Sequence, residues 1–423
     1  MNIGKVKELI NNGHYDESFG KLYSDINVAR ARYSDACDEF LKLYGDRDNI
    51  RIFSAPGRTE VGGNHTDHQH GCVLAGSAEL DVIAIVSENP GDMIHVKSAG
   101  YPMDELSAYD TEIKQNELGR ACALIRGVCA AFQKDGHNIG GFDAYTTSNV
   151  LKGSGLSSSA AFEVLISNII NGLFCGGKVD AVTMAKYSQF AEREYFGKPC
   201  GLLDQMASSV GGFTYADFNE PANPIVEKID LDLSKSGHTL CVVDTGGNHA
   251  DLTQDYADIT IECKLISNAL DVEFLRDADE NRFYSQLAAL RKSCGDRAVL
   301  RAFHFFNENA RVEEQKAALK AADFDKFFAL VNESGNSSYD YLQNLYSNSN
   351  VAEQGLPIAL ALTKKYLGGR GACRVHGGGF AGTIQCYIPD EMLDGYRKMI
   401  EAVFGENTCV VLKIRPVGGY ELH

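Results

Sequence analysis

The 423-residue chain contains no Cys-x-x-Cys pair among its twelve cysteines and no long run of apolar residues. A chain of this length does not need disulfides for stability, so we interpret the cysteines as reduced thiols of a cytoplasmic protein. The first residues, MNIGKVKELINNGHYDESF, lack the apolar core of a secretory signal, and no window approaches the roughly 18 apolar residues of a membrane span. We therefore expect a protein that is neither exported nor held in a membrane.

Basic residues are also scarce, with 40 Lys and Arg against 57 Asp and Glu, for a formal net charge of −17. Such a charge repels a nucleic-acid backbone or an anionic membrane surface, and no basic block offsets it. We expect neither as a partner. A phosphate-bearing ligand would need a local site.

The composition is that of a globular protein, with 44% apolar and 23% charged residues, and the length predicts two domains. Residues 1–45 are polar and helix-patterned and predict a helical lead-in, with Val6, Ile10, Phe19, Leu22, Phe40 and Leu43 as its spaced apolar positions. Strand and helix signals are mixed after that, which predicts an α+β fold for a first domain over residues 46–218 and a second over 219–423. The Pro-containing segment 219–224 is the expected boundary.

The periodicity of the apolar residues and the positions of Gly and Pro predict individual strands and helices. The expected strands are 50–54, 80–87, 142–147 and 239–244; the expected helices are 158–174 and 180–196, followed by a helix-rich stretch over 252–345 and a closing helix, turn and strands from 357 onward.

Residues 151–161 read LKGSGLSSSAA and lie between a strand signal and an amphipathic helix. Glycines allow the backbone to approach an anion, and the unpaired N–H groups at a helix start favour negative charge. The pattern predicts a phosphate-binding loop. A Gly-rich loop with serine caps is the alternative from this segment alone.

A second polar segment, APGRTEVGGNHTDH, covers residues 55–68. Its closely spaced His and Asp residues also suggest a zinc site, although no distant ligand supports one, and a structural turn is a further alternative. Downstream stand Glu192, which alone would be interpreted as a solvated helix residue, and PCGLLDQ at residues 199–205. The segments 245–256 (TGGNHADLTQDY) and 374–382 (RVHGGGFAG) complete the set, and three consecutive glycines before a strand are costly without a function.

In this order and spacing the segments resemble the GHMP kinases, and more closely the galactokinases. GSGLSSSAA resembles the second GHMP motif, residues 57–68 resemble the galactokinase signature G-R-V-N-L-I-G-E-H-T-D-Y, and RVHGGGFAG resembles the third motif, with His376 where a small residue is usual. The resemblance implies an N-terminal domain like ribosomal protein S5 domain 2, a ferredoxin-like C-terminal domain, and a site in the cleft between them.

The resemblance also implies roles for individual residues in the transfer of the γ-phosphoryl group of ATP to a sugar, with Mg²⁺. Asp204 and Arg58 would be catalytic, with Arg58 keeping Asp204 ionised. Ser159 and Glu192 would hold Mg²⁺. The sugar would be bound by Asn64, His65, Asp67, Gly201 and Tyr256, and the ATP phosphates by Gly153, Ser154, Gly155, Leu156, Ser157, Ser158 and Ser159. For Tyr256 a core tyrosine explains the pattern about as well.

We expect the substrate to be galactose, phosphorylated at its anomeric hydroxyl, by an enzyme that is a monomer or a weak homo-oligomer. The main alternative is galacturonate, because Asn64 stands where galactokinases have Glu and because HTDHQ at residues 65–69 also resembles galacturonokinases. A sugar sensor without catalysis and a GHMP kinase for a non-sugar remain further alternatives.

Overall fold

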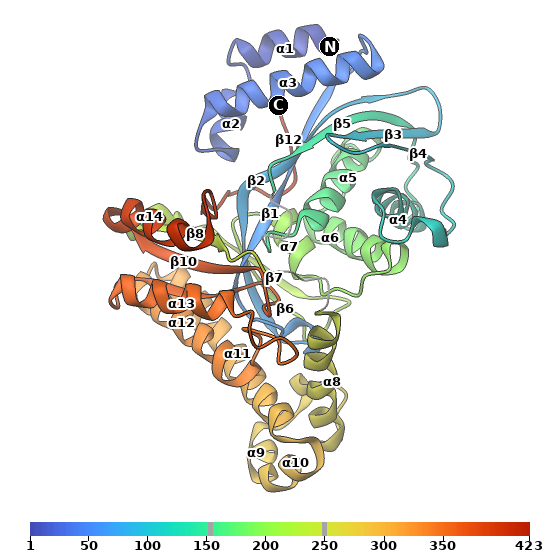
Figure 1. The fold of residues 1–423 in the computed structure, drawn as a ribbon. Coiled ribbons are helices and arrows are strands. Elements are labelled where there is room, and N and C mark those ends of the chain that lie inside the picture. Colours follow the sequence, from blue (N-terminus) through green and yellow to red (C-terminus); the bar gives the residue numbers. More distant parts are fainter. Residues whose placement is uncertain (151–154, 248–251) are drawn as a thin grey trace.

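The computed structural model describes residues 1–150, 155–247 and 252–423. In this part of the chain the strands form two sheets, one of eight strands and one of four. Figure 1 shows helices α1 to α3 grouped at one end of the molecule, and helices α9 and α10 at the tip of an arm at the other end.

The first sheet is built around the long antiparallel pair β1 and β2. Its order is β12-β1-β2-β5-β3-β4, with β6 and β7 attached through β2, and only β3 and β5 pair in parallel. The strands are β1 (Arg51–Gly62), β2 (Cys72–Glu88), β3 (Met93–Ser98), β4 (Met103–Ser107), β5 (Phe142–Ser148), β6 (Phe213–Asp217), β7 (Ile225–Ile229) and β12 (Tyr420–Glu421).

Both faces of this sheet are covered, and alternate residues of β2 pack to opposite sides. Ala84 and Val86 join the core that includes the apolar face of helix α5. Ile83 and Ile85 join a separate core with the lead-in helices. The sheet is therefore a buried platform between two helical layers.

The second sheet is antiparallel, in the order β11-β8-β10-β9. On one face, Ile384 and Ile388 pack with helices α13 and α14. On the other face, Tyr387 contacts the rings of Phe327 and Phe328 on helix α12. The strands are β8 (His238–Asp244), β9 (Ala372–His376), β10 (Thr383–Pro389) and β11 (Cys409–Leu412).

The predicted helices are present in the described chain, and α4 and α7 are further helices that the sequence patterns did not predict. The helices of the described chain are α1 (Ile3–Asn11), α2 (Asp16–Leu22), α3 (Ile26–Tyr44), α4 (Ala121–Lys134), α5 (Ser158–Cys175), α6 (Ala181–Phe190), α7 (Leu203–Val210), α8 (Thr253–Ala269), α9 (Glu280–Ser285), α10 (Leu287–Cys294), α11 (Asp296–Lys320), α12 (Phe324–Ser337), α13 (Gly355–Leu367) and α14 (Leu393–Phe404).

The α+β class is confirmed, and so are the helical lead-in and most of the predicted elements. Leu43 is an exception, because its side chain is 40% exposed. β1 is longer than predicted: it continues through the polar signature segment, with irregularities between Pro56 and Arg58 and between Glu60 and Gly62. Bulges of this kind redirect side chains while keeping the strand paired.

The boundary predicted at residue 219 stays a prediction. It falls in the connection between β6 and β7, which pair with each other in the first sheet. We propose a boundary after β7 instead, because a hairpin belongs to one sheet.

One helix among the described residues is long and apolar enough to cross a membrane by length and hydropathy alone, contrary to our expectation. This helix is α5, and 61% of the residues in that window are buried inside the fold. It packs against β1 and β2 as a core helix. Such helices pass the same test in soluble proteins.

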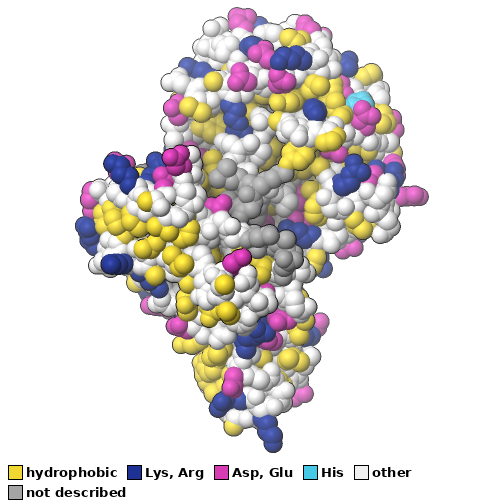
Figure 2. Space-filling model, in the orientation of Figure 1, with side chains coloured by type: hydrophobic (Ala, Val, Ile, Leu, Met, Phe, Trp, Pro, Cys, Tyr) yellow, Lys and Arg dark blue, Asp and Glu magenta, His cyan; other side chains and the backbone are white. Residues whose placement is uncertain are grey.

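Charged side chains of both signs are interspersed over the face in Figure 2, where the described residues form no continuous basic stripe. This distribution agrees with the excess of acidic residues. The cysteines, all of which are in the described residues, carry free thiols.

Candidate active site

Arg58 and Asp204, predicted as the catalytic pair, are brought together from β1 and the first turn of α7. The Nε atom of Arg58 donates to Oδ1 of Asp204 at 2.7 Å. Burial alone would raise the pKa of Asp204, but the Arg58 guanidinium and the Ser157 hydroxyl hold that pKa below its ordinary value. Asp204 is therefore a carboxylate, available to orient a hydroxyl group.

The loop before α5 closes over this pair. Nη1 of Arg58 donates to the carbonyl of Gly155, and its backbone N–H donates to the carbonyl of Leu156 at 3.0 Å. Ser157 has a positive φ of 55° and its hydroxyl donates to Asp204. Ser158 and Ser159 then begin α5, so their backbone N–H groups lie at the positive end of the helix dipole. Two predicted loop residues, Gly153 and Ser154, lie outside the described residues.

Glu192, predicted as a metal ligand, lies in a π-helical turn, Ala191–Phe196, that continues α6. Its side chain is almost fully buried, and Oε1 accepts a hydrogen bond of 2.9 Å from the Ser159 hydroxyl. Lys198 lies 2.9 Å from the same oxygen. The π-turn adds a residue to the helical turn and is a common device at functional sites.

The Ser159 and Glu192 pair fits a hard cation. Mg²⁺ is usually bound by one or two protein oxygens, with water and substrate phosphates completing the octahedron. The pair supplies one carboxylate and one hydroxyl at the start of the phosphate loop helix. Among the described residues there is no group of three or more His, Cys, Asp or Glu side chains arranged for a metal such as zinc.

Asp67 and Gly201 meet on the sugar side of the predicted site. A Cβ atom added to Gly201 would lie 1.6 Å from Oδ2 of Asp67, so only glycine allows this approach. Burial, together with the nearby charge of Asp204, raises the pKa of Asp67 to about 6. The charges of the two carboxyl groups therefore interact in the folded protein.

His65 and Tyr256 are also near each other, with ring centroids 6.5 Å apart. Nε2 of His65 is 2.8 Å from the carbonyl of Gly378, and the Tyr256 hydroxyl donates to the carbonyl of Gly379 at 2.9 Å. Both side chains therefore bind the third motif. This arrangement holds the glycine turn against the signature segment.

Asn64 lies deeper than the other predicted sugar residues, with no exposed surface. Its Nδ2 donates to Oε1 of Glu60 at 2.9 Å and to the carbonyl of Gly377 at 2.8 Å, while Oδ1 accepts from Asn344 at 2.8 Å. The galactokinase signature has Asn and Glu at positions 60 and 64, so this chain has the two residue types exchanged. The contact of Asn64 with a sugar stays a prediction.

Sequence reasoning missed two buried glutamates that support the site. Glu163 shares the Nε2 group of Gln205 with Glu192, at 3.0 Å and 2.7 Å respectively. It lies one helical turn after Ser159, a spacing that could have revealed it. Glu308 on α11 accepts a hydrogen bond of 3.0 Å from the backbone of Gly63 in the signature segment, and no local pattern indicates this contact.

His68 is a further unexpected feature. Neither ring nitrogen has a hydrogen-bond partner among the described residues, and both are buried. Burial lowers the pKa of His68 to about 3, so the ring is neutral.

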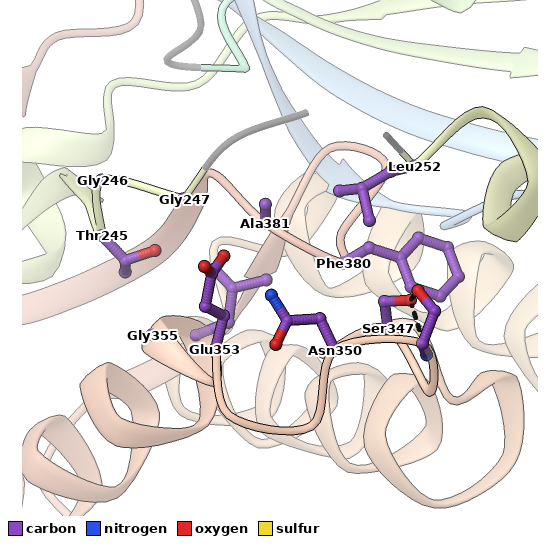
Figure 3. Close-up of a pocket in the computed structure, with 12 residues that line it drawn as sticks. Thr245, Gly246, Gly247, Leu252, Ser347, Asn350, Glu353, Gly355, Phe380 and Ala381 are labelled. Carbon is purple, nitrogen blue, oxygen red and sulfur yellow. Dashed lines mark hydrogen bonds between the residues drawn. The ribbon is translucent and has the colours of Figure 1, made fainter. Parts of the chain in front are cut away.

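A separate cavity of about 550 Å³ lies behind the third motif. Figure 3 shows Glu353 and Asn350 beside it, with Phe380 and Leu252 at another side. The ring of Phe380 packs edge-on against Tyr256 at 5.3 Å. The cavity therefore adjoins the predicted sugar side through one aromatic layer.

Two family models match the chain. The GHMP kinases N terminal domain matches residues 123–212, and the galactokinase galactose-binding signature matches residues 38–88. The first match covers the phosphate loop, Glu192 and Asp204. The second covers Arg58 and Asp67.

Curated relatives match along most of the chain. A galactokinase of Streptomyces coelicolor is 29% identical over 369 residues, covering 87% of this chain and 92% of its own. A galactokinase of Glaesserella parasuis is 28% identical over 382 residues, covering 88% and 94%.

Solved structures share the fold. Lactococcus lactis galactokinase complexed with galactose superimposes with a TM-score of 0.77 at 22% identity, covering 92% of this chain and all of its own. The mevalonate kinase of Methanococcus jannaschii has a TM-score of 0.61 at 14% identity, covering 87% and 99%. The fold and the motif-bearing segments are similar to those of the GHMP kinases. Within that superfamily the chain is similar to galactokinases along most of its length, and with the matched kinase domain this similarity indicates a sugar kinase.

Proposed function

We propose that the protein transfers the γ-phosphoryl group of ATP to the anomeric hydroxyl of galactose, giving galactose 1-phosphate and ADP. The observation that carries this proposal is the Arg58 and Asp204 pair, held at 2.7 Å where β1, the phosphate loop and α7 meet. Galactokinases from several bacteria are the relatives that match along most of the chain.

Each described part of the site has a role in this reaction. The start of α5 binds the ATP phosphates through backbone N–H groups and the serines. Ser159 and Glu192 would hold Mg²⁺, which would supply positive charge to neutralise the phosphates. Phosphoryl transfer needs positioning and charge stabilisation more than covalent help from the protein.

Asp204 positions the nucleophilic hydroxyl and can take its proton, because Arg58 keeps the carboxylate ionised. Arg58 also offers its guanidinium to the charge that develops on the transferred group. His65, Asp67, Gly201 and Tyr256 surround the sugar. A buried polar set of this kind rejects sugars that lack the matching hydroxyl.

The exchanged pair Glu60 and Asn64 bears on the choice of sugar. If Asn64 simply removed the negative charge of the family's Glu, a sugar with a C6 carboxylate would be tolerated. In this chain a carboxyl group stands four residues earlier, at Glu60, where it is hydrogen-bonded to Asn64 and paired with Arg374 at 2.7 Å. Burial raises the pKa of Glu60 to about 7, so its negative charge is restored above that pH. This favours galactose over galacturonate.

The test is ADP release by purified protein with Mg²⁺, ATP and one sugar at a time: galactose, galacturonate, N-acetylgalactosamine, glucose and arabinose. We expect galactose to give at least about 100-fold higher kcat/KM than galacturonate, the loss that an unmatched buried polar group produces. Preference for galacturonate would assign Asn64 as a specificity switch. Turnover of none of the sugars, with normal ATP binding, would favour a sugar sensor.

We further propose that the protein acts in a reducing, cytoplasmic compartment as a monomer or weak homo-oligomer. Twelve free thiols, most of them buried, support the reducing compartment. Sedimentation at several concentrations tests the oligomeric state.

A further inference from the structure

His376 is the last residue of β9 and stands in the third motif where the family usually has a small residue. Its side chain is 2% exposed and lies between three segments of the site. Nδ1 is 2.9 Å from the hydroxyl oxygen of Thr383 on β10. Nε2 is 3.1 Å from the hydroxyl oxygen of Thr59 and 3.3 Å from the backbone nitrogen of Glu60, both on β1.

These partners define the tautomer of the ring. The backbone N–H of Glu60 can only donate, so Nε2 must be the acceptor and carries no hydrogen. The Thr59 hydroxyl accepts from Gln385 at 2.6 Å, which leaves its own hydrogen free to point at Nε2. The neutral ring therefore has its proton on Nδ1, from which it donates to Thr383.

The same ring supports the phosphate loop. A Cβ atom added to Gly155, which has a φ of +71°, would lie 2.9 Å from Nδ1 of His376 and 3.0 Å from the hydroxyl oxygen of Thr383. The loop backbone thus rests directly on this pair. The carbonyl of Gly155 in turn accepts a hydrogen bond from Arg58.

Two neighbours of His376 hold the adjacent part of β1. Gln385 donates to the carbonyl of Glu60 at 2.8 Å, and Arg374 donates to the carbonyl of Val61 at 2.7 Å. Three side chains from the second sheet, namely Arg374, His376 and Gln385, therefore fix the residues that directly follow Arg58. His376 also contacts Gly155, in the described part of the phosphate loop.

We propose that His376 is a positioning residue for phosphoryl transfer, which aligns Arg58 with Asp204 by fixing Thr59 and Glu60 on one side and Gly155 on the other. It does not touch the substrate and acts through Arg58. The kinetic part of this proposal rests on the proposed phosphoryl transfer. The hydrogen-bonding part can be measured without any turnover.

The kinetic test compares His376→Gln, His376→Asn and His376→Ala. The amide oxygen of Gln can reach the position of Nε2 and accept from Thr59 and Glu60, whereas the Asn amide is shorter and reaches only the position of Nδ1. We expect kcat to fall about 10- to 100-fold in the Ala variant, as for a lost positioning contact, and less than about 5-fold in the Gln variant, with the Asn variant nearer to Ala. The KM for galactose should change less than about twofold in all three. A Gln variant as impaired as Ala would contradict the acceptor role.

A double-mutant cycle separates positioning of Arg58 from a general structural role. If His376 acts through Arg58, His376→Ala should lower kcat by less than about 3-fold in an Arg58→Ala background, since residues that act as a unit are non-additive. Equal effects in both backgrounds would overturn the proposal. His238→Asn is the matched control: His238 begins β8 in the same sheet and is partly buried. Its ring hydrogen-bonds to the carbonyl of Ser236 and packs on Phe328, so kcat should stay within about twofold.

The tautomer provides the readout that is independent of activity. In protein labelled with ¹⁵N-histidine at neutral pH, His376, assigned by its loss in the His376→Gln variant, should show a pyridine-type shift for Nε2 and a pyrrole-type shift for Nδ1. The reverse tautomer, or a doubly protonated ring, would overturn the inference. If no sugar is phosphorylated but this tautomer is found, the proposed function fails while the contacts proposed for His376 stand.

Discussion

The guanidinium of Arg58 lies 2.7 Å from the carboxylate of Asp204, and this contact joins the signature strand β1 to the first turn of α7. Arg58 is almost fully buried and also donates to the carbonyl of Gly155 in the phosphate loop. The positive charge of Arg58 is thus fixed between Asp204, which would orient the nucleophilic hydroxyl, and the phosphate loop.

Asp204→Asn should lower kcat by at least about 100-fold, because an amide can neither take the proton nor pair with Arg58 in the same way. ATP affinity should change less than about threefold, since Asp204 contacts the phosphate loop through a hydrogen bond from Ser157, a side chain that Asp204→Asn leaves in place. Steady-state kinetics and calorimetric ATP titration measure the two effects. An equal loss of ATP affinity would show that the role is misassigned.

Glu192→Gln and Ser159→Ala should raise the Mg²⁺ concentration needed for half-maximal activity, by about 10-fold or more, because each removes an oxygen ligand or its charge. The exposed Glu194, two residues further on, provides the control Glu194→Gln, which should leave the Mg²⁺ dependence unchanged. The measurement is activity as a function of free Mg²⁺ at saturating ATP, from which the half-maximal Mg²⁺ concentration of each variant is compared. Similar curves for Glu192→Gln and Glu194→Gln would contradict the metal role.

The pH dependence of kcat/KM for the sugar should show the titration of Asp67. Its pKa is raised to about 6 by burial and by the charge of Asp204, so the ionised acceptor of a sugar hydroxyl is present above pH 6 and lost as pH falls through 6. Asp67→Asn should lower kcat/KM and remove this inflection. A variant profile that keeps the inflection would assign it to another group.

The raised pKa of Asp67 also affects the stability of the fold, which should decrease as pH rises, whereas kcat/KM should increase. Because the folded-state pKa of Asp67 is raised, its favourable contribution is complete below the unfolded value near 4 and is lost as pH rises through 6. Asp67→Asn should therefore raise the unfolding temperature at pH 7.5 relative to wild type, but not at pH 4. Thermal unfolding at the two pH values measures this difference.

Glu308→Gln should destabilise the protein at neutral pH. Burial would raise the pKa of Glu308, but His304 and Arg311 outweigh burial and lower this pKa to about 2. A lowered carboxyl pKa stabilises the fold above the unfolded value, here by about 3 kcal/mol, and this contribution is lost as pH falls from about 4.5 to 2. Denaturant unfolding at pH 7 and pH 3 should show a difference between wild type and variant that narrows at the lower pH. Glu314→Gln, at an exposed position of the same helix, is the control.

Much of the fold could be predicted from sequence because local signals were strong. Helix α5 has serines before it and Gly176 as its left-handed C-terminal residue, and its bounds match the prediction within one residue. The full length of β1 could not be predicted. Its second half, Arg58 to Gly62, carries polar and glycine residues whose burial comes from contacts with distant segments such as β9 and α11.

The candidate site likewise combines residues that local motifs predicted with residues placed by contacts between distant segments. Arg58, Asp204, Ser159 and Glu192 could be paired in advance because their motifs occur in a recognisable order. The burial of Asn64 could not, since its partners Glu60, Gly377 and Asn344 come from three parts of the chain. Supporting residues such as Glu308 and His376 act through tertiary contacts that no local pattern records.

The most direct test of the central claim is to follow the reaction of ATP, Mg²⁺ and ¹³C-labelled galactose by ³¹P and ¹³C NMR. We predict one ADP formed for each galactose consumed, with ³¹P coupling at the C1 resonance that shows phosphate on the anomeric oxygen. Phosphate on another hydroxyl, or ADP formed without a phosphorylated sugar, would contradict the account.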